Sequence, residues 1–420
     1  LAYAGAAATE RLRLVGTISA RVVTGSQQLF FCMDDHIRPH HMIAIVAENG
    51  VDAISPAFDQ RFGVRRITLL SPQPLLPRAR DLAAIVRNAG KGCEVDGLLS
   101  AWRPQALLGQ LQAVLQQRHD EPWLINLSGA NPALAALLYQ LASQQQIPAF
   151  VIEPETDKAV WLIRPPSDPS RAETVEVADQ IGLRQYFASC GYELLHASAT
   201  LKQRNFRAER TAKFLADIAL HQPRTLQHLN RAGAELDPQL RSFVHFDADD
   251  LRSLDFLVEL GFLHWHHHDR VQFSSGEARN FLCGGWLELY VFATLAELAQ
   301  TLPVQDAAMG LTVRTRQQAA SEFDVVFMAN NHLYLIECKS RAPRRNNGIG
   351  MDTLFKLGSL ADQQGLNSHA MLVTLTPPTP AEAQRARSQQ IELIAGKGLG
   401  ELGERLHDWI CGGPAAGSGI

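Results

Sequence analysis

The N-terminal part of the chain alternates short apolar runs with segments of helical periodicity. The apolar runs lie at Met42–Ala47, Arg66–Leu70, Trp123–Leu127 and Pro148–Ile152. The helical segments lie near Pro77–Gly90, Pro104–His119 and Ala133–Ser143. Strands that alternate with helices at this spacing are typical of a parallel, doubly wound sheet. We therefore expect an α/β domain over residues 42–157, and we treat residues 1–41, whose periodicity is weak, as a separate leader.

Two further regions follow. Pro, Asp, Ser and Thr concentrate around residues 155–170, which marks a boundary. The region 158–274 is mostly helical by pattern, and its end, a helix over Leu251–Leu263 and a hairpin over His264–Phe273, resembles a winged helix. We expect it to link the first domain to a third one, over residues 275–420.

The third region again mixes helices and strands. Helices are expected at Gly284–Gln300, Asp352–Gln363 and Pro380–Ser388. Strands are expected at Leu311–Arg316, Glu322–Met328, His332–Lys339, Ala370–Leu375 and Ile391–Ala395. This pattern predicts a second α/β domain.

Composition and charge narrow the function only a little. With 420 residues the chain is long enough for two or three domains. Lys and Arg number 39 against 43 Asp and Glu, a net charge of −4, so any nucleic-acid surface must be local. The six cysteines form no CxxC pair, which favours reduced thiols in a cytoplasmic protein. No apolar run approaches the roughly 20 residues of a bilayer span, so we expect no membrane association.

The segment SEFDVVFMANNHLYLIECKS carries the most specific chemistry. If Asn330 and Asn331 form a two-residue hairpin turn, Asp324 lies opposite Glu337, with Cβ atoms roughly 5 Å apart. A divalent cation relieves the repulsion between two such carboxylates, and Mg²⁺ or Mn²⁺ prefers these ligands. Lys339 projects from the same face as Glu337, where it can stabilise charge on a phosphate. The alternative is a solvated, salt-bridged hairpin.

Two neighbouring features extend this candidate site. Glu288 is a lone acid in the apolar helix GWLELYV, and is either a third metal-binding carboxylate or an ordinary exposed one. A basic loop follows Lys339, and it either binds phosphates or is solvated. Its residues are Arg341, Arg344, Arg345, Asn346, Asn347 and Gly348.

The first domain has a candidate ligand loop of its own. Asn126, Ser128, Gly129, Ala130 and Asn131 lie between a buried strand and a helix that Pro132 opens. Backbone N–H groups at such a helix start favour an anionic ligand, and ligands of open α/β sheets lie at the carboxyl ends of the strands. Asn49, in the loop after the first strand, would be a neighbour. A purely structural tight turn is the alternative.

The residues resemble a known family. GGWLELYVF, SEFDVVF and LYLIECKS resemble the nuclease half of the CARF-domain effector nucleases of type III CRISPR systems, and NLSGANPALAALLY resembles their sensor motif. The resemblance implies a Rossmann-like sensor joined to a PD-(D/E)xK, restriction-endonuclease-like domain. By position, Glu288, Asp324 and Glu337 match the metal ligands, Lys339 the catalytic lysine, and Cys338 a ligand through its carbonyl. Ala130, Asn131 and Pro132 depart from the sensor motif, where Gly, Thr and Lys are usual.

The resemblance also implies a function. A homodimer would bind a cyclic oligoadenylate, with cyclic tetra-adenylate matching the two-fold symmetry, and would then cut DNA or RNA with Mg²⁺ or Mn²⁺. Two alternatives remain open: a nucleotide-sensing transcriptional regulator with an inactive nuclease-like domain, and a restriction-type endonuclease without second-messenger control.

Two other clusters are candidates. His264, His266 and His268 would share one face of a strand and bind Zn²⁺, or form a polar hairpin without metal. A basic helical stripe would follow a nucleic-acid backbone or be a solvated face. The stripe consists of Lys202, Arg204, Arg207, Arg210 and Lys213.

Overall fold

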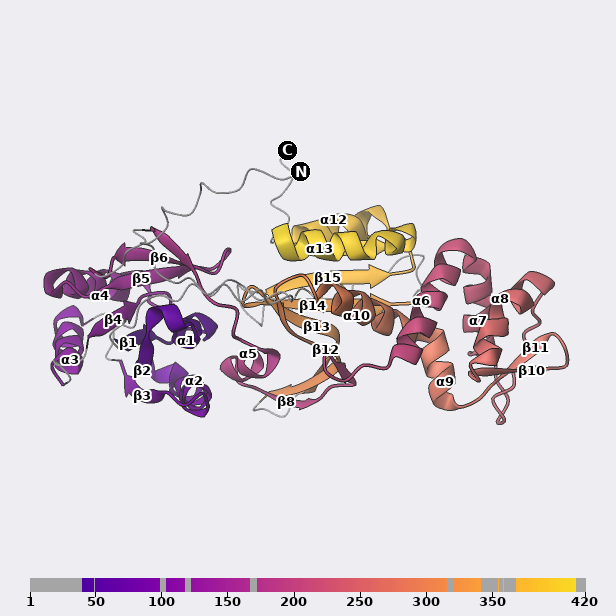
Figure 1. Ribbon diagram of the computed structural model, residues 1–420, viewed down its shortest axis with the longest axis horizontal. Coiled ribbons are helices and arrows are strands. Elements are labelled where there is room, and N and C mark those ends of the chain that lie inside the picture. Colours follow the sequence, from indigo (N-terminus) through magenta and orange to yellow (C-terminus); the bar gives the residue numbers. More distant parts are fainter. Residues whose placement is uncertain are drawn as a thin grey trace, which may run out of the picture. The chain divides into compact units, whose positions relative to one another are not determined.

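The central strands of the N-terminal sheet are buried on both sides because they are apolar at successive positions. In β1 (His40–Ile45), Met42 and Ala44 belong to one apolar core, and Ile43 and Ile45 to another. Alternate residues of a strand point to opposite faces, so such a strand needs cover on both. The computed structural model accordingly has helices on both faces of this sheet (Figure 1).

This sheet has seven strands in the order β3-β2-β1-β4-β5-β6-β7. The other strands are β2 (Val64–Ser71), β3 (Gly92–Gly97), β4 (Trp123–Asn126), β5 (Ala149–Glu153), β6 (Lys158–Ile163) and β7 (Thr174–Glu176). Neighbours among β1 to β5 pair in parallel, whereas β6 and β7 are antiparallel additions at one edge. The expected parallel sheet is confirmed, with an edge that the sequence pattern did not predict.

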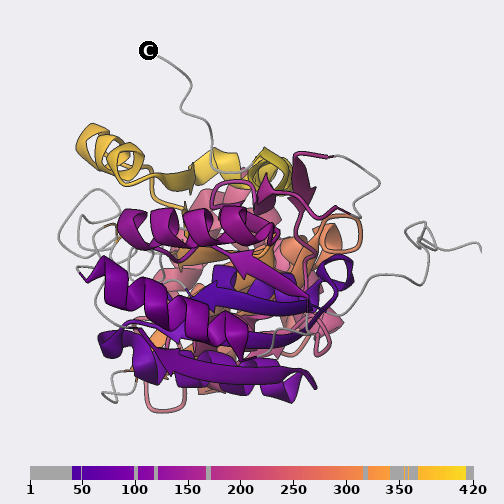
Figure 2. The same cartoon turned by 90° about the vertical axis from the view of Figure 1, so that its left-hand side faces the viewer.

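Two pairs of helices cover the sheet. On one face, α1 (Val51–Phe58) and α2 (Leu76–Asn88) pack into the core that contains Met42. Two short 3-10 turns lie on the same stretch of chain: η1 (Gln60–Phe62) precedes β2, and η2 (Gln73–Leu75) precedes α2. On the other face, α3 (Pro104–Gln116) and α4 (Pro132–Gln145) pack into the core with Ile43. Figure 2 shows α3 and α4 side by side. The arrangement is doubly wound, as predicted.

A second sheet carries the C-terminal domain. Its strands follow the order β16-β15-β14-β13-β12-β8, and β9 also pairs with β12. The strands are β8 (Tyr192–His196), β9 (Ala199–Thr200), β12 (Val304–Thr315), β13 (Ala320–Ala329), β14 (His332–Lys339), β15 (Ser368–Thr374) and β16 (Ile391–Ala395). β12, β13 and β14 are antiparallel, and β14, β15 and β16 are parallel.

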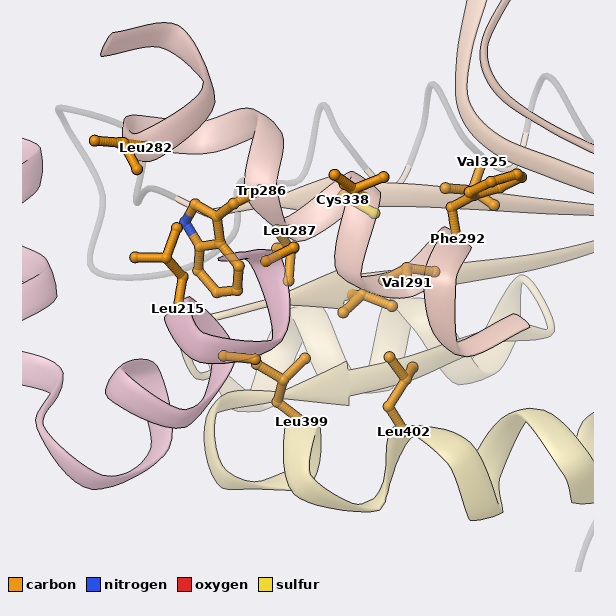
Figure 3. Packing of buried hydrophobic residues seen from close by; sticks show 14 of the residues in the cluster. Leu215, Leu282, Trp286, Leu287, Val291, Phe292, Val325, Cys338, Leu399 and Leu402 are labelled. Atoms are coloured by element: carbon orange, nitrogen blue, oxygen red, sulfur yellow. The ribbon is translucent and has the colours of Figure 1, made fainter. Parts of the chain in front are cut away.

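Helix α10 forms the centre of the C-terminal core. Figure 3 shows Trp286 and Leu287 of its first turn among Leu215, Leu399 and Leu402, which come from three other helical elements. The helices and turns of this region are α9 (Gly276–Asn280), a π-helical turn η3 (Phe281–Gly285), α10 (Trp286–Leu298), α12 (Pro380–Ser388), η4 (Gly396–Glu401) and α13 (Leu402–Gly412). The apolar packing fixes the position of the first turn of α10.

The helical stretch Gly276–Leu298 is long and apolar enough, by length and composition alone, to cross a membrane. Of its most apolar window, however, 56% is buried inside the fold, as is usual for a core helix. This stretch is therefore weak support for a membrane span.

The middle region has the element order of a winged helix. It consists of α5 (Leu183–Ser189), α6 (Phe206–His221), α7 (Pro223–Ala232), α8 (Ala248–Glu259), β10 (Leu263–His266) and β11 (Arg270–Phe273). β10 and β11 form the expected hairpin, and an isolated bridge joins Arg241 to Gln272. Leu215 and Leu229 share one core with Trp286, so the middle region packs on the C-terminal domain.

The sheets cross the expected domain boundaries at several points. β6 and β7 continue the N-terminal sheet beyond residue 157, and β8 and β9, from the expected linker, extend the C-terminal sheet. β1 begins at His40 rather than at Met42. Edge pairing of this kind links segments far apart in sequence, which local periodicity does not reveal.

The structure describes residues 40–48, 50–98, 103–117, 122–166, 172–315, 320–340, 354, 358 and 368–412. All of them belong to one unit, Arg38–Ile420. Asn49, the basic loop after Ser340, the leader and most of the helix expected at Asp352–Gln363 lie outside the described residues.

One polar contact joins the N-terminal sheet to the C-terminal sheet. The side-chain amide of Asn331, in the turn between β13 and β14, donates to Asp157 Oδ2 over 2.6 Å. Asp157 lies between β5 and β6 and is only 3% exposed. Burial raises its pKa to about 8, and the charges of Asp52, Asp179 and Glu176 add to this, against the effect of the Asn331 hydrogen bond.

This raised pKa predicts a pH-dependent stability. A carboxyl group whose folded-state pKa is raised stabilises the fold fully below its ordinary pKa of 3.8, and this contribution is lost as pH rises through about 8. Asp157→Asn keeps the acceptor for Asn331 and suits the left-handed backbone at φ 51°. Between about pH 6 and pH 9, the melting temperature should therefore fall more in the wild type than in the variant. The same fall in both proteins contradicts the assignment.

Candidate active site and sensor loop

The hairpin register of β13 and β14 is the one predicted from Asn330 and Asn331. Both residues have left-handed backbones, with φ of 50° and 55°, as a type I′ turn requires. Pairing runs from Ala329↔His332 to Val325↔Ile336 and stops there. Asp324 and Glu337 are therefore the first residues beyond this pairing, on facing strands that both continue past it.

The end of this pairing frees backbone groups for the site. Asp324 Oδ2 accepts a hydrogen bond from the Cys338 backbone N–H at 2.7 Å. The N–H and C=O of one strand residue point to the same side, so the Cys338 carbonyl is also directed toward β13. Its thiol points into the core beside Val291, Phe292 and Val325 (Figure 3). Any metal contact by Cys338 therefore has to come from its carbonyl.

Strand alternation places the three charged groups on one face. Val326 and Leu335 lie in one core, and Asp324 and Glu337 share their face by the two-residue period. Lys339 is two residues beyond Glu337, and its Nζ lies 2.5 Å from Glu337 Oε1. The structure brings these three residues together as the sequence predicted.

Glu288 reaches the same centre from α10. Gly284, in the π-helical turn before α10, lies close to Ser340: a Cβ added there would be 3.4 Å from Ser340 Oγ. The start of the helix therefore lies beside the residue that follows Lys339, and Glu288 is in its first turn. The charges of Asp324 and Lys339 both act on the Glu288 carboxyl, which confirms that these groups are near one another.

The electrostatics show an acidic site that lacks compensation. Burial raises the pKa of Glu288 to about 7, and the Asp324 charge adds to this. Burial and the Glu337 charge raise the pKa of Asp324 to about 6. Burial would lower the pKa of Lys339, but the hydrogen bond and charge of Glu337 outweigh it, so its pKa is raised and it stays protonated. Partly buried carboxylates that repel one another are stabilised by a cation.

The donor set fits a hard divalent cation. Three carboxylates and one backbone carbonyl are oxygen ligands, which Mg²⁺ and Mn²⁺ prefer. Among the described residues, no three His, Cys, Asp or Glu side chains already converge at metal-binding distance. Instead, Lys339 holds Glu337, and the Cys338 N–H holds Asp324. Binding a cation would exchange these contacts for metal ligation.

Glu322 is an acid that the sequence reasoning missed. It precedes Asp324 by two residues on β13, so it lies on the same face, and its charge also raises the pKa of Glu288 and of Asp324. The two-residue alternation of side chains along a strand would have been enough to identify Glu322 from the sequence. Its exposed position places it at the outer edge of the centre.

The candidate sensor loop is held by its own polar side chains. Asn126 Nδ2 donates to the Asp52 carbonyl at 2.6 Å, and Asn126 Oδ1 accepts from the Ser128 N–H and hydroxyl. Ser128 Oγ accepts from Ile152 N at 2.8 Å, and Asn131 Oδ1 caps α4 by accepting from Leu134 N. Three of the five predicted side chains in this loop therefore shape it from within.

Gly129 allows the loop to lie on the end of β1. A Cβ at this position would be 2.2 Å from the Ile45 carbonyl oxygen, so no other residue fits without backbone movement. The Ala130 N–H donates to the Leu127 carbonyl in the turn. The loop lies at the carboxyl ends of β1 and β4, the edge at which ligands of such sheets bind.

The two other clusters form internal structure. The stripe residues Arg204 and Lys213 bind Glu209 and Glu297, Arg207 donates to the Leu260 carbonyl, and Arg210 lies over the Phe256 ring. The histidine run forms β10 and the turn before β11. In the described part of the chain it belongs to no group of three metal-binding side chains.

Comparison with known proteins supports the endonuclease interpretation. Residues 275–412 match the family described as "Card1-like, endonuclease domain". This match confirms the nuclease half of the resemblance, for the C-terminal part of the chain. No curated protein matches the chain at a significant level.

Two solved structures share the fold over nearly the whole chain. Protein VC1899 from Vibrio cholerae has a TM-score of 0.75 and 23% sequence identity, over 89% of this chain and 98% of that chain. Can2 from Sulfobacillus thermosulfidooxidans, solved in complex with cyclic tetra-adenylate, has a TM-score of 0.71 and 18% identity, over 88% of this chain and 99% of that chain. At these identities the likeness shows the fold.

The acidic centre predicts cation-dependent stability. Mn²⁺ should raise the melting temperature of the wild type, because it offsets the repulsion among the carboxylates. Glu288→Gln should remove most of this increase, whereas Glu392→Gln, on β16 and bonded to Arg405, should keep it. Because protons compete for Glu288 and Asp324, the increase should be smaller at about pH 6 than at about pH 8. An increase of equal size in Glu288→Gln would show that the cation binds elsewhere.

Proposed function

We propose that this chain is a divalent-cation-dependent nuclease that hydrolyses phosphodiester bonds in DNA or RNA after binding a cyclic oligoadenylate. The observation that supports it most is the placement of Asp324 and Glu337 at the open end of a hairpin, with Lys339 on the same face. The family match of residues 275–412 adds the endonuclease class. Such an enzyme would act in the cytoplasm, in type III CRISPR antiviral defence.

The residues have separate roles in this proposal. Glu288, Asp324, Glu337 and the Cys338 carbonyl would hold Mg²⁺ or Mn²⁺. A bound cation of this kind polarises the phosphate and acidifies a water molecule. Lys339 is protonated, so it can donate hydrogen bonds to the attacking water or to a phosphate oxygen as negative charge develops there. The hydrogen bond from Lys339 to Glu337 positions the ammonium for this role.

The sensor part of the proposal rests on the loop at the carboxyl edge of the first sheet. The loop spans Asn126 to Asn131, and hydrogen bonds of its own side chains hold it in place. Preformed loops of this kind lower the entropy cost of binding. Cyclic tetra-adenylate is the activator we expect, since it is the ligand of the similarly folded Can2.

We further propose that the active form is a homodimer, paired through the uncharged face of α3 and α4. Neither helix contains a charged residue or a histidine. Their exposed residues include Gln105, Ala106, Gln112, Ala113, Ala136, Tyr139 and Gln140. A second copy can meet this face without like-charge repulsion. Because α4 begins at the sensor loop, pairing here would bring two such loops toward one ligand.

The middle region argues against the transcriptional regulator. Its α8 occupies the place of a recognition helix, yet it carries Asp249, Asp255 and Glu259 against a single basic residue, Arg252. A helix of this charge is repelled by the phosphate backbone. An inactive nuclease-like domain would also have no use for three acids and a lysine placed together at one site. The restriction-type alternative lacks a role for the sensor loop.

Catalysis is tested by Glu337→Ala and Lys339→Ala. With Mn²⁺ and cyclic tetra-adenylate, Glu337→Ala should cut nucleic acid only at background, and Lys339→Ala should lose about 10²- to 10³-fold in rate. Calorimetric titration should show wild-type affinity for cyclic tetra-adenylate in both. The wild type should cut far faster with the activator than without it. Full cutting by either variant, or equal wild-type cutting without activator, contradicts the proposal.

The dimer is tested by Tyr139→Arg, which places a charge on the uncharged face. Tyr139 is 45% exposed, and Phe243, in the middle region and 59% exposed, offers a matched control as Phe243→Arg. Light scattering should give twice the chain mass for the wild type and the control, and the chain mass for Tyr139→Arg. A dimer that persists in Tyr139→Arg would exclude this face.

A further inference from the structure

The turn between the two catalytic strands is held by residues of the sensor. We define the hairpin-tip junction as Asn331 and His332 with the sensor residues Pro154 and Asp157 that they bind. Asn331 is 1% exposed. Its Nδ2 donates to Asp157 Oδ2 at 2.6 Å and to the Ala178 carbonyl at 3.2 Å. Its Oδ1 accepts from Gln305 Nε2 at 2.6 Å and from Ile181 N at 3.3 Å.

All the hydrogen-bonding capacity of the Asn331 amide is thus used. An amide side chain has two donor hydrogens and two acceptor lone pairs, and each finds a partner here. Three partners belong to the sensor sheet or the segment that follows it, and one belongs to β12 of the second sheet. A turn only needs a residue that tolerates a left-handed backbone, so four side-chain bonds exceed what the turn requires.

His332 makes a second bond across the same junction. Its Nε2 lies 2.8 Å from the Pro154 carbonyl oxygen, in a nearly buried position. Burial lowers the pKa of His332, so the ring is neutral and carries its proton on Nε2, which donates to this carbonyl. Pro154 and Asp157 lie in the turn that joins β5 to β6.

The sensor loop connects to this turn by hydrogen bonds. Ser128 Oγ accepts from Ile152 N, two residues before Pro154. By a second route, Asn126 Nδ2 binds the Asp52 carbonyl, and the Asp52 charge acts on Asp157. A ligand that displaces Asn126 or Ser128 therefore acts on both sensor residues of the hairpin-tip junction, Pro154 and Asp157.

On the nuclease side, the paired strands transmit movement of the turn. The five pairs from Ala329↔His332 to Val325↔Ile336 form one ribbon that ends at Asp324 and Glu337, and β12 and β15 pair with its two outer sides. Glu288 lies on α10 and outside this ribbon. Tilting the turn would therefore move two of the acids relative to the third.

We propose that Asn331 is a positioning residue through which the sensor sets the placement of Asp324 and Glu337 relative to Glu288. This inference rests on the proposed function. In this proposal the ligand changes the hydrogen bonds of Asn126 and Ser128, and the hairpin-tip junction then shifts the turn between β13 and β14. Because the two strands are paired, this shift also moves the carboxylates of Asp324 and Glu337. For the ligand to control cutting in this way, the hairpin must adopt two arrangements whose balance the ligand shifts.

The neighbouring Asn330 provides a matched control. It has the same side chain in the same turn and a similar φ, but its amide donates to the Ile410 carbonyl of α13 and not to the sensor. Asn331→Gly and Asn330→Gly both keep a residue that accepts the left-handed backbone. Only Asn331→Gly removes a side-chain bond to the sensor.

The experiment measures cutting of nucleic acid with Mn²⁺, with and without cyclic tetra-adenylate, together with affinity for cyclic tetra-adenylate. In Asn331→Gly the ratio of activated to basal cutting should fall at least about fivefold, with affinity retained, whereas Asn330→Gly should keep the wild-type ratio. A merely structural role would lower both rates in proportion and leave the ratio unchanged, which would overturn the inference. A wild type whose cutting does not respond to the activator contradicts the proposed function itself.

A pair of charge variants tests the same bond without removing the side chain. Asn331→Asp removes the two N–H donors that bind Asp157 and the Ala178 carbonyl, and should lower the ratio. In the double variant with Asp157→Asn, the amide is at position 157 and the carboxylate at position 331. A hydrogen bond can then form in the opposite direction, and part of the ratio should be restored. If Asn331→Asp keeps the wild-type ratio, or if the double variant shows no recovery, the Asp157–Asn331 bond does not carry the coupling.

Discussion

The repulsion between two carboxylates at the end of a paired hairpin is the constraint on which the rest of this structure depends. β13 and β14 pair from their turn to Val325↔Ile336 and then separate. Asp324 and Glu337 stand on facing chains at this opening, partly buried, where water does little to screen them. Lys339 and the Cys338 N–H each bind one of them. Burial, and after it the remaining negative charge, raises the pKa values of Asp324 and Glu288, and a divalent cation would neutralise this charge.

Other elements serve to hold this opening in place. The apolar first turn of α10 fixes Glu288 beside the strand ends, and Gly284, just before this turn, lies beside Ser340. At the opposite end of the ribbon, Asn331 ties the turn to the sensor. The hairpin therefore carries Asp324 and Glu337 at one end and the contact of Asn331 with the sensor at the other. This arrangement gives a physical reason for fusing the two domains.

Parts of this fold could be predicted because the signals are local. The bounds of the strand His332–Lys339 and of the helix Pro380–Ser388 were predicted to the residue. The strand is an apolar run directly after an Asn-Asn turn. The helix begins with a capping box of Thr379 and Glu382. Long-range features were missed. β6, with the sequence KAVWLI, is apolar but lies within the stretch that we interpreted as a boundary, and the edge strand β7 has only three residues. β8 pairs with a strand more than 100 residues away. The contact of Asn331 with Asp157, at a separation of 174 residues, has no signature in the sequence.

The central claim is that Glu288, Asp324 and Glu337 together bind a divalent cation. A crystal of the full chain grown with Mn²⁺ and recorded with anomalous scattering tests this directly. The account predicts a manganese peak in contact with carboxylate oxygens of all three residues, and with the Cys338 carbonyl. A Mn²⁺-dependent, cutting-competent protein whose crystals show manganese only at other positions would contradict it.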